Sequence, residues 1–194
     1  LYAARVGAEL MLRTGKPMQA QALYEAVVAA KTLPWAKLGV ARAQLDDGQV
    51  AKATSTLANL ISEDPTYTDA YDVMGRAQFE IGKFEDALAT YRMASELTPA
   101  SITRLQNLGM LTYYSGSHDE AEKLLDKTTR LGLNSKMFDC QTLVLLAFMR
   151  LESADRKGLQ RCREDFARLI ERNPDSERHQ RLADETQLDE DLVA

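Results

Sequence analysis

Apolar residues recur at helical spacing along most of the chain. In residues 68–81 apolar side chains lie three and four positions apart, and residues 83–97 repeat this pattern. Gly82, between the two segments, suits the left-handed residue that ends a helix and reverses the chain. Gly75 and Ala87 lack bulk, so the two helix axes can approach closely where they cross. The pattern predicts a helix–turn–helix hairpin.

The hairpin recurs with a period of 34 residues. A shift by this length places Gly75 on Gly109 and Gly82 on Gly116, and a shift in the other direction places Gly82 on Gly48. Further matches lie at Gly15, Ala20, Tyr24, Ala53, Leu57, Ala121, Leu97 and Leu131. A fixed period of this length predicts a stack of hairpins that bury their apolar sides on one another.

Helix-ending and helix-starting residues agree with this division. Pro65 and Pro99 follow the second helix of their units, where a proline can open the next helix. Ser117 and Glu120 have the S-x-x-E spacing of a capping box at the start of a helix. Each unit is therefore bounded as a helical hairpin should be.

These landmarks resemble the tetratricopeptide repeat, a 34-residue helix–turn–helix unit. The resemblance is carried by Tyr71, Met74, Gly75, Gly82, Phe84, Ala87, Tyr91, Ala94 and Pro99, and in the preceding unit by Trp35, Leu38 and Gly39. It implies an all-α, right-handed superhelical solenoid that forms one domain. We expect about five units at 1–31, 32–66, 67–101, 102–135 and 136–174, followed by a polar capping helix at 175–194.

Three units depart from the pattern. In the 102–135 unit Leu105 replaces the aromatic residue, Thr128 the alanine and Leu133 the proline. Gly39 and Gly48 lie farther apart than the matching glycines of later units, which predicts a longer first helix or turn in the 32–66 unit. The fifth unit keeps Cys140, Leu143 and Phe166 but needs about six extra residues, which we expect between its two helices.

Composition limits the function. Hydrophobic residues make up 45% of the chain and charged residues 27%, as in a folded soluble protein, and no apolar run is long enough to span a membrane. The net charge of −5 argues against a phosphate backbone as partner. Cys140 and Cys162 fit neither a zinc site nor a redox motif, so we expect buried, reduced thiols and a cytoplasmic protein.

Candidate chemistry is sparse. The sequence holds no nucleotide-binding, hydrolase or metalloprotease motif, and its two histidines, His118 and His179, lie at predicted helix starts. We therefore expect no catalytic residue, no metal site and no cofactor. A basic cluster is either a solvated helix with Arg161–Asp165 and Glu164–Arg168 pairs or a contact for an acidic partner or a phosphate. Its members are Arg156, Lys157, Arg161, Arg163 and Arg168.

The resemblance also implies a binding surface. In such repeats the first helix of each hairpin lines a concave groove, which here would present Asp69, Asp72, Arg76, Phe79, Glu80, Gln106, Asn107, Met110, Tyr113, Tyr114, Gln141, Leu145 and Phe148. Aromatic residues with a polar rim suit a peptide or helix anchor. Phe79, Tyr113 and Tyr114 could instead pack against a neighbouring repeat, and for Phe79 packing is favoured. Asp69 and Asp72 would repel the acidic tails that some co-chaperones of this family bind.

We therefore expect a non-catalytic scaffold that binds a peptide or helix of another protein. The chain also resembles the tetratricopeptide half of certain bacterial response regulators, which implies a receiver domain ahead of Leu1. An RNA-reading helical repeat is an alternative that the acidic positions oppose. An enzyme is a third, and it requires another polar group converging on His118 or His179.

Overall fold

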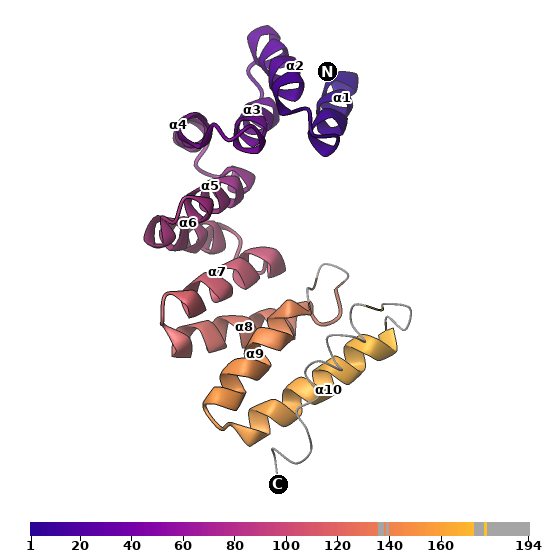
Figure 1. The fold of residues 1–194 in the computed structure, drawn as a ribbon, viewed down its shortest axis with the longest axis vertical. Coiled ribbons are helices and arrows are strands. Elements are labelled where there is room, and N and C mark those ends of the chain that lie inside the picture. The colour runs from indigo at the N-terminus through magenta and orange to yellow at the C-terminus, as the bar shows by residue number, and fades with distance from the viewer. Residues whose placement is uncertain (136–137, 139, 173–176, 178–194) are drawn as a thin grey trace. The chain divides into compact units, whose positions relative to one another are not determined.

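The computed structural model of the chain describes residues 1–135, 138, 140–172 and 177, and all regular secondary structure within them is helical. The chain forms two compact units, residues 1–98 and 99–194, each of which is considered by itself (Figure 1). The predicted all-α fold is confirmed. The expected capping helix at 175–194 lies outside the described residues, apart from Glu177. Among the residues described, no helix combines the length and the apolar character needed to cross a membrane.

Unit 1 contains three helical hairpins. Its helices are α1 (Tyr2–Arg13), α2 (Pro17–Ala30), α3 (Pro34–Asp46), α4 (Val50–Glu63), α5 (Thr68–Glu80) and α6 (Phe84–Leu97). Each helix packs on the next, and the first helices α1, α3 and α5 also contact one another in turn. Alanines and leucines fill the core between the hairpins, where Ala41, Leu57 and Ala70 are almost entirely buried. The first helices thus form one layer and the second helices another.

Unit 2 contains two hairpins. Its helices are α7 (Ile102–Tyr114), α8 (His118–Gly132), α9 (Gln141–Glu152) and α10 (Arg156–Arg172). The four helices pack consecutively, and the first helices α7 and α9 also contact each other. One core cluster joins α8, α9 and α10 through Leu125, Leu146 and Cys162. Cys140 and Cys162 are both buried and are not joined by a disulfide, as the sequence predicts.

A left-handed glycine closes four of the hairpins. Gly15, Gly48, Gly82 and Gly116 have φ between 70° and 85°. Beside each glycine the next backbone N–H bonds a carbonyl five residues back, as from Lys83 to Gln78 at 2.8 Å. The fifth hairpin makes the same turn with Ala154, at φ 55°. The glycine turn predicted at residue 82 is confirmed.

The 34-residue register holds through the third unit, so the prediction of a longer first helix or turn in the 32–66 unit is wrong. Helices α3 and α5 both contain 13 residues and begin 34 positions apart. In this register Gly75 corresponds to Ala41, and Trp35 corresponds to Asp69. The Trp35–Leu38–Gly39 match is therefore displaced by two residues from the repeat itself.

Two further sequence expectations are wrong. The helices of the fifth unit are not spread apart, because three residues join α9 to α10, as in the other hairpins. The additional residues lie before this hairpin, between Gly132 and Gln141. Ser117 is the residue preceding α8, but its side chain makes no capping hydrogen bond, so the predicted capping box is not formed.

The close helix crossing predicted at Gly75 is confirmed. Gly75 is buried in α5, and a Cβ atom built on it would lie 2.5 Å from Cε2 of Tyr91 in α6. The matching Gly109 in α7 faces Leu125 in α8, where a Cβ atom would lie 2.7 Å from Cδ2. Neither contact leaves room for a side chain without movement of the partner.

Candidate functional site

In unit 1 the predicted groove residues of α5 form a charged, partly exposed surface. Asp69 and Arg76 are exposed and Asp72 is half-buried. Arg76 lies 3.8 Å from Asp46 in α3 and 3.5 Å from Glu80 in its own helix. Such exposed pairs contribute about 0–1 kcal/mol to stability, so these charges remain available to a partner.

Neighbouring polar contacts on α1 and α3 belong to the same surface. The Arg42 guanidinium donates a hydrogen bond to Glu9 at 2.8 Å, and the Arg5 guanidinium lies 5.4 Å from the centre of the Trp35 ring. The sequence does not assign Trp35 or Arg42 to the groove directly, because Trp35 matches the aromatic-x-x-Leu-Gly signature of the repeat. The 34-residue register from Asp69 and Arg76 leads directly to these two positions.

Glu9 also links this surface to the core of unit 1. The Tyr24 hydroxyl donates a hydrogen bond to Glu9 at 3.1 Å, while the Tyr24 ring packs edge-on against Trp35. Burial, followed by the charge of Glu9, raises the pKa of Tyr24 from 10.0 to about 12. Tyr24 is therefore a neutral hydrogen-bond donor at physiological pH.

Phe79 is more exposed than expected. It is 43% exposed at the end of α5, so the favoured alternative of core packing is wrong. Its ring meets Phe84 of α6 edge-on, with the ring centres 5.3 Å apart, and Phe84 is exposed as well. The two rings form a small apolar patch beside the Gly82 turn.

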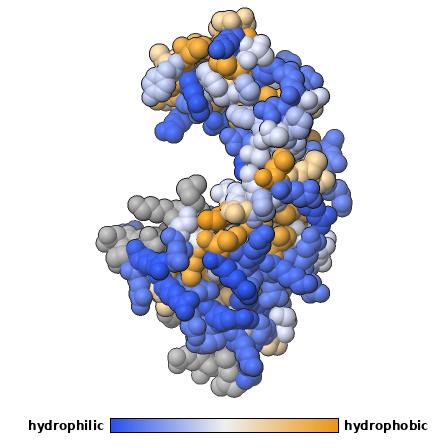
Figure 2. All heavy atoms as spheres, turned by 180° about the vertical axis from the view of Figure 1, so that it is seen from behind, coloured by the Kyte–Doolittle hydropathy of each residue, from blue (hydrophilic) through white to orange (hydrophobic). Residues whose placement is uncertain are grey.

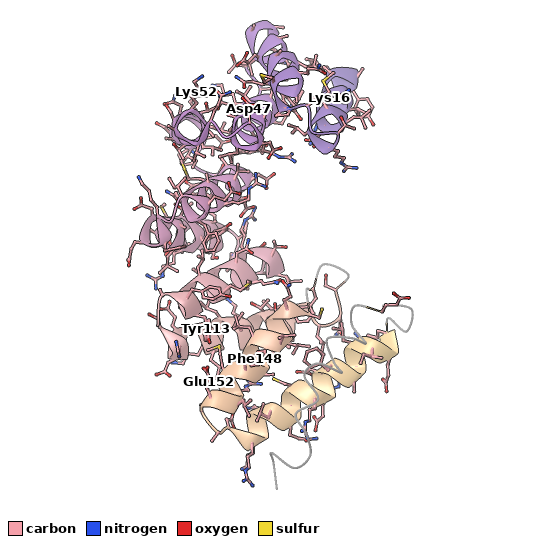
Figure 3. All side chains as sticks on the ribbon, in the orientation of Figure 1. Lys16, Asp47, Lys52, Tyr113, Phe148 and Glu152 are labelled. Atoms are coloured by element: carbon pink, nitrogen blue, oxygen red, sulfur yellow. The ribbon has the colours of Figure 1, made fainter. Side chains whose placement is uncertain are left out.

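In unit 2 the predicted residues of α7 and α9 form a more apolar surface. Tyr114 is 67% exposed and Phe148 is 54% exposed, while Met110 and Leu145 are half-buried. Figure 3 shows Tyr113, Phe148 and Glu152 in the same part of this unit. Figure 2 shows apolar residues on the visible face of the unit, bordered by hydrophilic ones. Exposed aromatic side chains of this kind are typical anchors for a partner.

The structure distinguishes the two adjacent tyrosines. Tyr113 is half-buried, packs against the core cluster of unit 2, and stacks on His118 with the ring centres 4.9 Å apart. Tyr114 meets Tyr113 edge-on at 5.5 Å and extends into solvent. Of the two alternatives, packing holds for Tyr113 and exposure for Tyr114.

The polar residues of this surface behave differently from one another. Gln141 is exposed and Asn107 is half-buried. Gln106 is only 8% exposed, which corrects the expectation that it faces a partner. The reason is that α7 is covered over a wide arc, with Leu105, Leu108 and Leu111 buried beside it.

A buried cation, which the sequence did not predict, lies behind this surface. Arg150 of α9 is 3% exposed and donates hydrogen bonds to Glu122 at 3.1 Å and Asp126 at 2.9 Å, both on α8. It also donates to the carbonyl of Gly158 and the sulfur of Cys162 on α10, each at 3.2 Å. One side chain thus connects three helices.

Burial and the neighbouring groups shift the pKa values of Arg150 and Cys162 in opposing ways. Burial alone would lower the pKa of Arg150, but the neighbouring Cys162, Glu122 and Asp126 raise it further above its ordinary value. Burial raises the pKa of the Cys162 thiol, and Arg150 opposes this shift only in part. Cys162 is therefore a neutral, buried thiol rather than a reactive one.

Catalytic groups do not converge around the described histidine. His118 is exposed and its ring stacks on Tyr113, and His179 lies outside the described residues. Within the part of the chain that the structure describes, no group of three His, Cys, Asp or Glu side chains could hold a metal ion.

Stacked helical hairpins of similar length, each closed by the same turn, define an α-helical repeat protein of the solenoid class. Residues 44–111 match the family model of the tetratricopeptide repeat. Over these residues the resemblance to the tetratricopeptide repeat that the landmarks predict is confirmed.

Known proteins agree with this assignment. The chain is 27% identical over 155 residues to tetratricopeptide repeat protein 37 of Xenopus laevis, covering 75% of the chain but 10% of that protein. Its fold resembles a MamA RS-1 double mutant, with a TM-score of 0.70 at 19% identity, over 91% of this chain and 97% of the other. It also resembles YrrB, a tetratricopeptide repeat protein with an unusual peptide-binding site, with a TM-score of 0.63 at 16% identity, over 91% and 86% of the two chains.

Proposed function

We propose that the chain is a non-catalytic interaction module whose first helices bind a peptide or a helix of another protein. Tetratricopeptide repeats generally mediate protein–protein interaction, and YrrB has a peptide-binding site within the same fold. The single observation that carries the proposal is the exposure of Tyr114 and Phe148 on the first helices of unit 2.

A partner that covers these exposed rings gains free energy from the burial of apolar area. Each aromatic side chain buries on the order of 150–250 Å² when covered, and apolar area removed from water contributes about 25 cal/mol per Å². Met110 and Leu145 lie half-buried on the same two helices and would extend the apolar contact. Asn107 and Gln141 supply polar groups that can bond a peptide backbone.

Unit 1 would supply polar contacts and specificity. Arg76, Asp69 and Trp35 lie on its first helices and can pair with charges or an apolar side chain of the partner. Asp69, Asp72 and Glu80 disfavour an acidic tail at this surface. They also disfavour RNA, and we do not propose the RNA alternative.

We further propose a role for the module in bacterial signalling, as the cytoplasmic output half of a response regulator with a receiver domain ahead of Leu1. This part rests on the sequence resemblance alone. The reading frame upstream of Leu1 tests it directly. A receiver domain with its phosphate-accepting aspartate supports the role, and an unrelated upstream sequence overturns it.

The binding proposal is tested with selected peptides. A displayed random peptide library is panned against the full chain, and the affinity of the best peptide is measured by fluorescence anisotropy. The pair Tyr114→Ala and Phe148→Ala should weaken binding at least about tenfold, since each ring is worth 1–2 kcal/mol or more at an anchor. The matched control exchanges the exposed apolar residues Met93 and Leu131 of the second helices for alanine. Equal affinity for all three proteins would refute the assignment.

A further inference from the structure

A polar cavity of about 660 Å³ lies in unit 2, on the second helices α8 and α10 rather than on the first helices. Helix α8 contributes Asp126, Thr129 and Arg130 to its lining, and α10 contributes Arg161, Glu164, Asp165, Arg168 and Arg172. Arg150 of α9 and the residues Leu133 and Asn134 after α8 complete the wall. Five arginines therefore surround one cavity in a chain whose net charge is −5.

Two of these arginines have no ionic partner among the described residues. Arg130 and Arg150 share Asp126, at 2.6 Å and 2.9 Å, and Arg168 pairs with Asp165 at 3.1 Å. Arg161 and Arg172 are exposed and make no ion pair within the described part of the chain. The helix is solvated, as one sequence alternative has it, but Arg168 pairs with Asp165 rather than with Glu164, and the predicted Arg161–Asp165 pair is not formed among the described residues.

The wall and the ligand-facing groups have different tasks. A guanidinium has five N–H groups, and Arg150 donates four hydrogen bonds to protein acceptors. It is therefore a structural part of the cavity wall. Arg161, Arg168 and Arg172 are spaced seven and four residues apart and lie along one face of α10. The guanidinium fork matches the geometry of carboxylate and phosphate oxygens.

The spacing of these side chains suggests the form of the ligand. At 1.5 Å of rise per residue, Arg161 and Arg168 start roughly 10 Å apart along α10, and Arg168 and Arg172 roughly 6 Å apart. An extended peptide covers these distances in about three and two residues. We propose that this cavity binds an acidic segment of another protein, with carboxylate or phosphate groups at such intervals.

This site differs from the proposed peptide surface in position and in charge. The first helices of unit 1 present Asp69, Asp72 and Glu80, which repel an acidic segment, whereas the cavity presents arginines that attract it. A partner could therefore bind both surfaces. Substitutions at one surface test its proposal independently of the other.

The test uses the full chain and three fluorescein-labelled nine-residue peptides. One carries glutamates at its third, sixth and eighth positions, one carries phosphoserines there, and one carries glutamines. Anisotropy should give binding of the first two peptides at least about tenfold tighter than of the third at low salt. If phosphoserine binds more tightly than glutamate, phosphate is the preferred group; if the two bind equally, carboxylate suffices.

The pair Arg161→Gln and Arg172→Gln should weaken binding of the acidic peptides at least about tenfold. The matched control is Arg156→Gln with Lys157→Gln, which removes two charges from the same helix outside the cavity and should change the affinity less than about twofold. Equal losses in both variants, or equal affinity for the neutral peptide, would overturn the proposal. Tighter binding of a single-stranded oligonucleotide, lost in the first variant, would overturn the assignment to a peptide.

Discussion

The Arg150 guanidinium donates a hydrogen bond to the Asp126 carboxylate across 2.9 Å and so joins α9 to α8 inside unit 2. Asp126 accepts a second arginine, Arg130, on its other oxygen at 2.6 Å. The first arginine is buried and the second is exposed. Two bonds to one carboxylate thus lie in very different surroundings.

This difference predicts unequal costs of substitution. Arg150→Met leaves Glu122 and Asp126 without their buried partner and should lower the free energy of unfolding by about 3 kcal/mol. Arg130→Met removes an exposed partner of the same carboxylate and should lower it by less than about 1 kcal/mol. Urea denaturation followed by circular dichroism measures both. Equal, small effects would mean that Arg150 is not a structural link.

The close crossing at Gly75 predicts a loss of stability that a second substitution partly restores. Gly75→Ala places a methyl group against the Tyr91 ring and should lower the free energy of unfolding by about 1–3 kcal/mol. The preceding repeat has alanine and leucine at the matching positions, Ala41 and Leu57, which pack in one cluster. Adding Tyr91→Leu to Gly75→Ala should therefore restore part of the loss. Thermal denaturation of wild type, the two single variants and the double variant gives the coupling free energy between the two sites. A coupling of zero would contradict the close contact.

The fifth turn offers a stabilising change. Ala154 holds the left-handed conformation that glycine holds in the other four turns. Ala154→Gly should raise the free energy of unfolding by up to about 1 kcal/mol, because glycine adopts positive φ without a steric cost. The reverse change, Gly116→Ala, should lower it by a similar amount. Differential scanning calorimetry of both proteins should show shifts of opposite sign.

Tyr24 predicts a loss of stability in alkali. Because its pKa is about 12 in the folded chain against 10.0 in the unfolded one, the unfolded phenol ionises first as the pH rises. The stabilisation is complete below pH 10 and falls by up to about 2–3 kcal/mol as the pH rises to 12. Tyr24→Phe should cost about 1 kcal/mol at neutral pH, through the lost bond to Glu9, and should lack this alkaline loss.

Urea denaturation at several pH values compares the two proteins. The difference between wild type and Tyr24→Phe should shrink above pH 10 and then reverse. Tyr114→Phe, at an exposed tyrosine, serves as the control and should follow wild type. A difference between wild type and Tyr24→Phe that does not change with pH would contradict the raised pKa.

The hairpins and their turns could be predicted from the sequence, whereas the exact register and the buried charges could not. The turn at Gly82 and the helices predicted from the apolar period follow from local conformation, which neighbouring residues determine. The register predicted from Trp35 was wrong because the local motif Trp35–Leu38–Gly39 is displaced by two residues from the 34-residue repeat. The burial of Arg150 could not be predicted, since its partners Glu122 and Asp126 lie 28 and 24 residues away on another helix.

The adjacent tyrosines illustrate the same limit at the proposed surface. Tyr113 and Tyr114 project about 100° apart around α7. Which of them faces solvent depends on the rotation of α7 about its axis when it packs against α8 and α9. The sequence period does not determine that rotation. The exposed anchor Tyr114 could therefore be named only as one of two alternatives.

Amide hydrogen exchange shows whether a partner binds on the first helices. With a saturating selected peptide, protection should increase in residues 102–114 and 141–152, which form α7 and α9. Residues 118–132 and 156–172, which form the second helices, should exchange as in the free chain. Protection confined to the second helices, or none at all despite binding, would mean that the partner does not bind on the first helices.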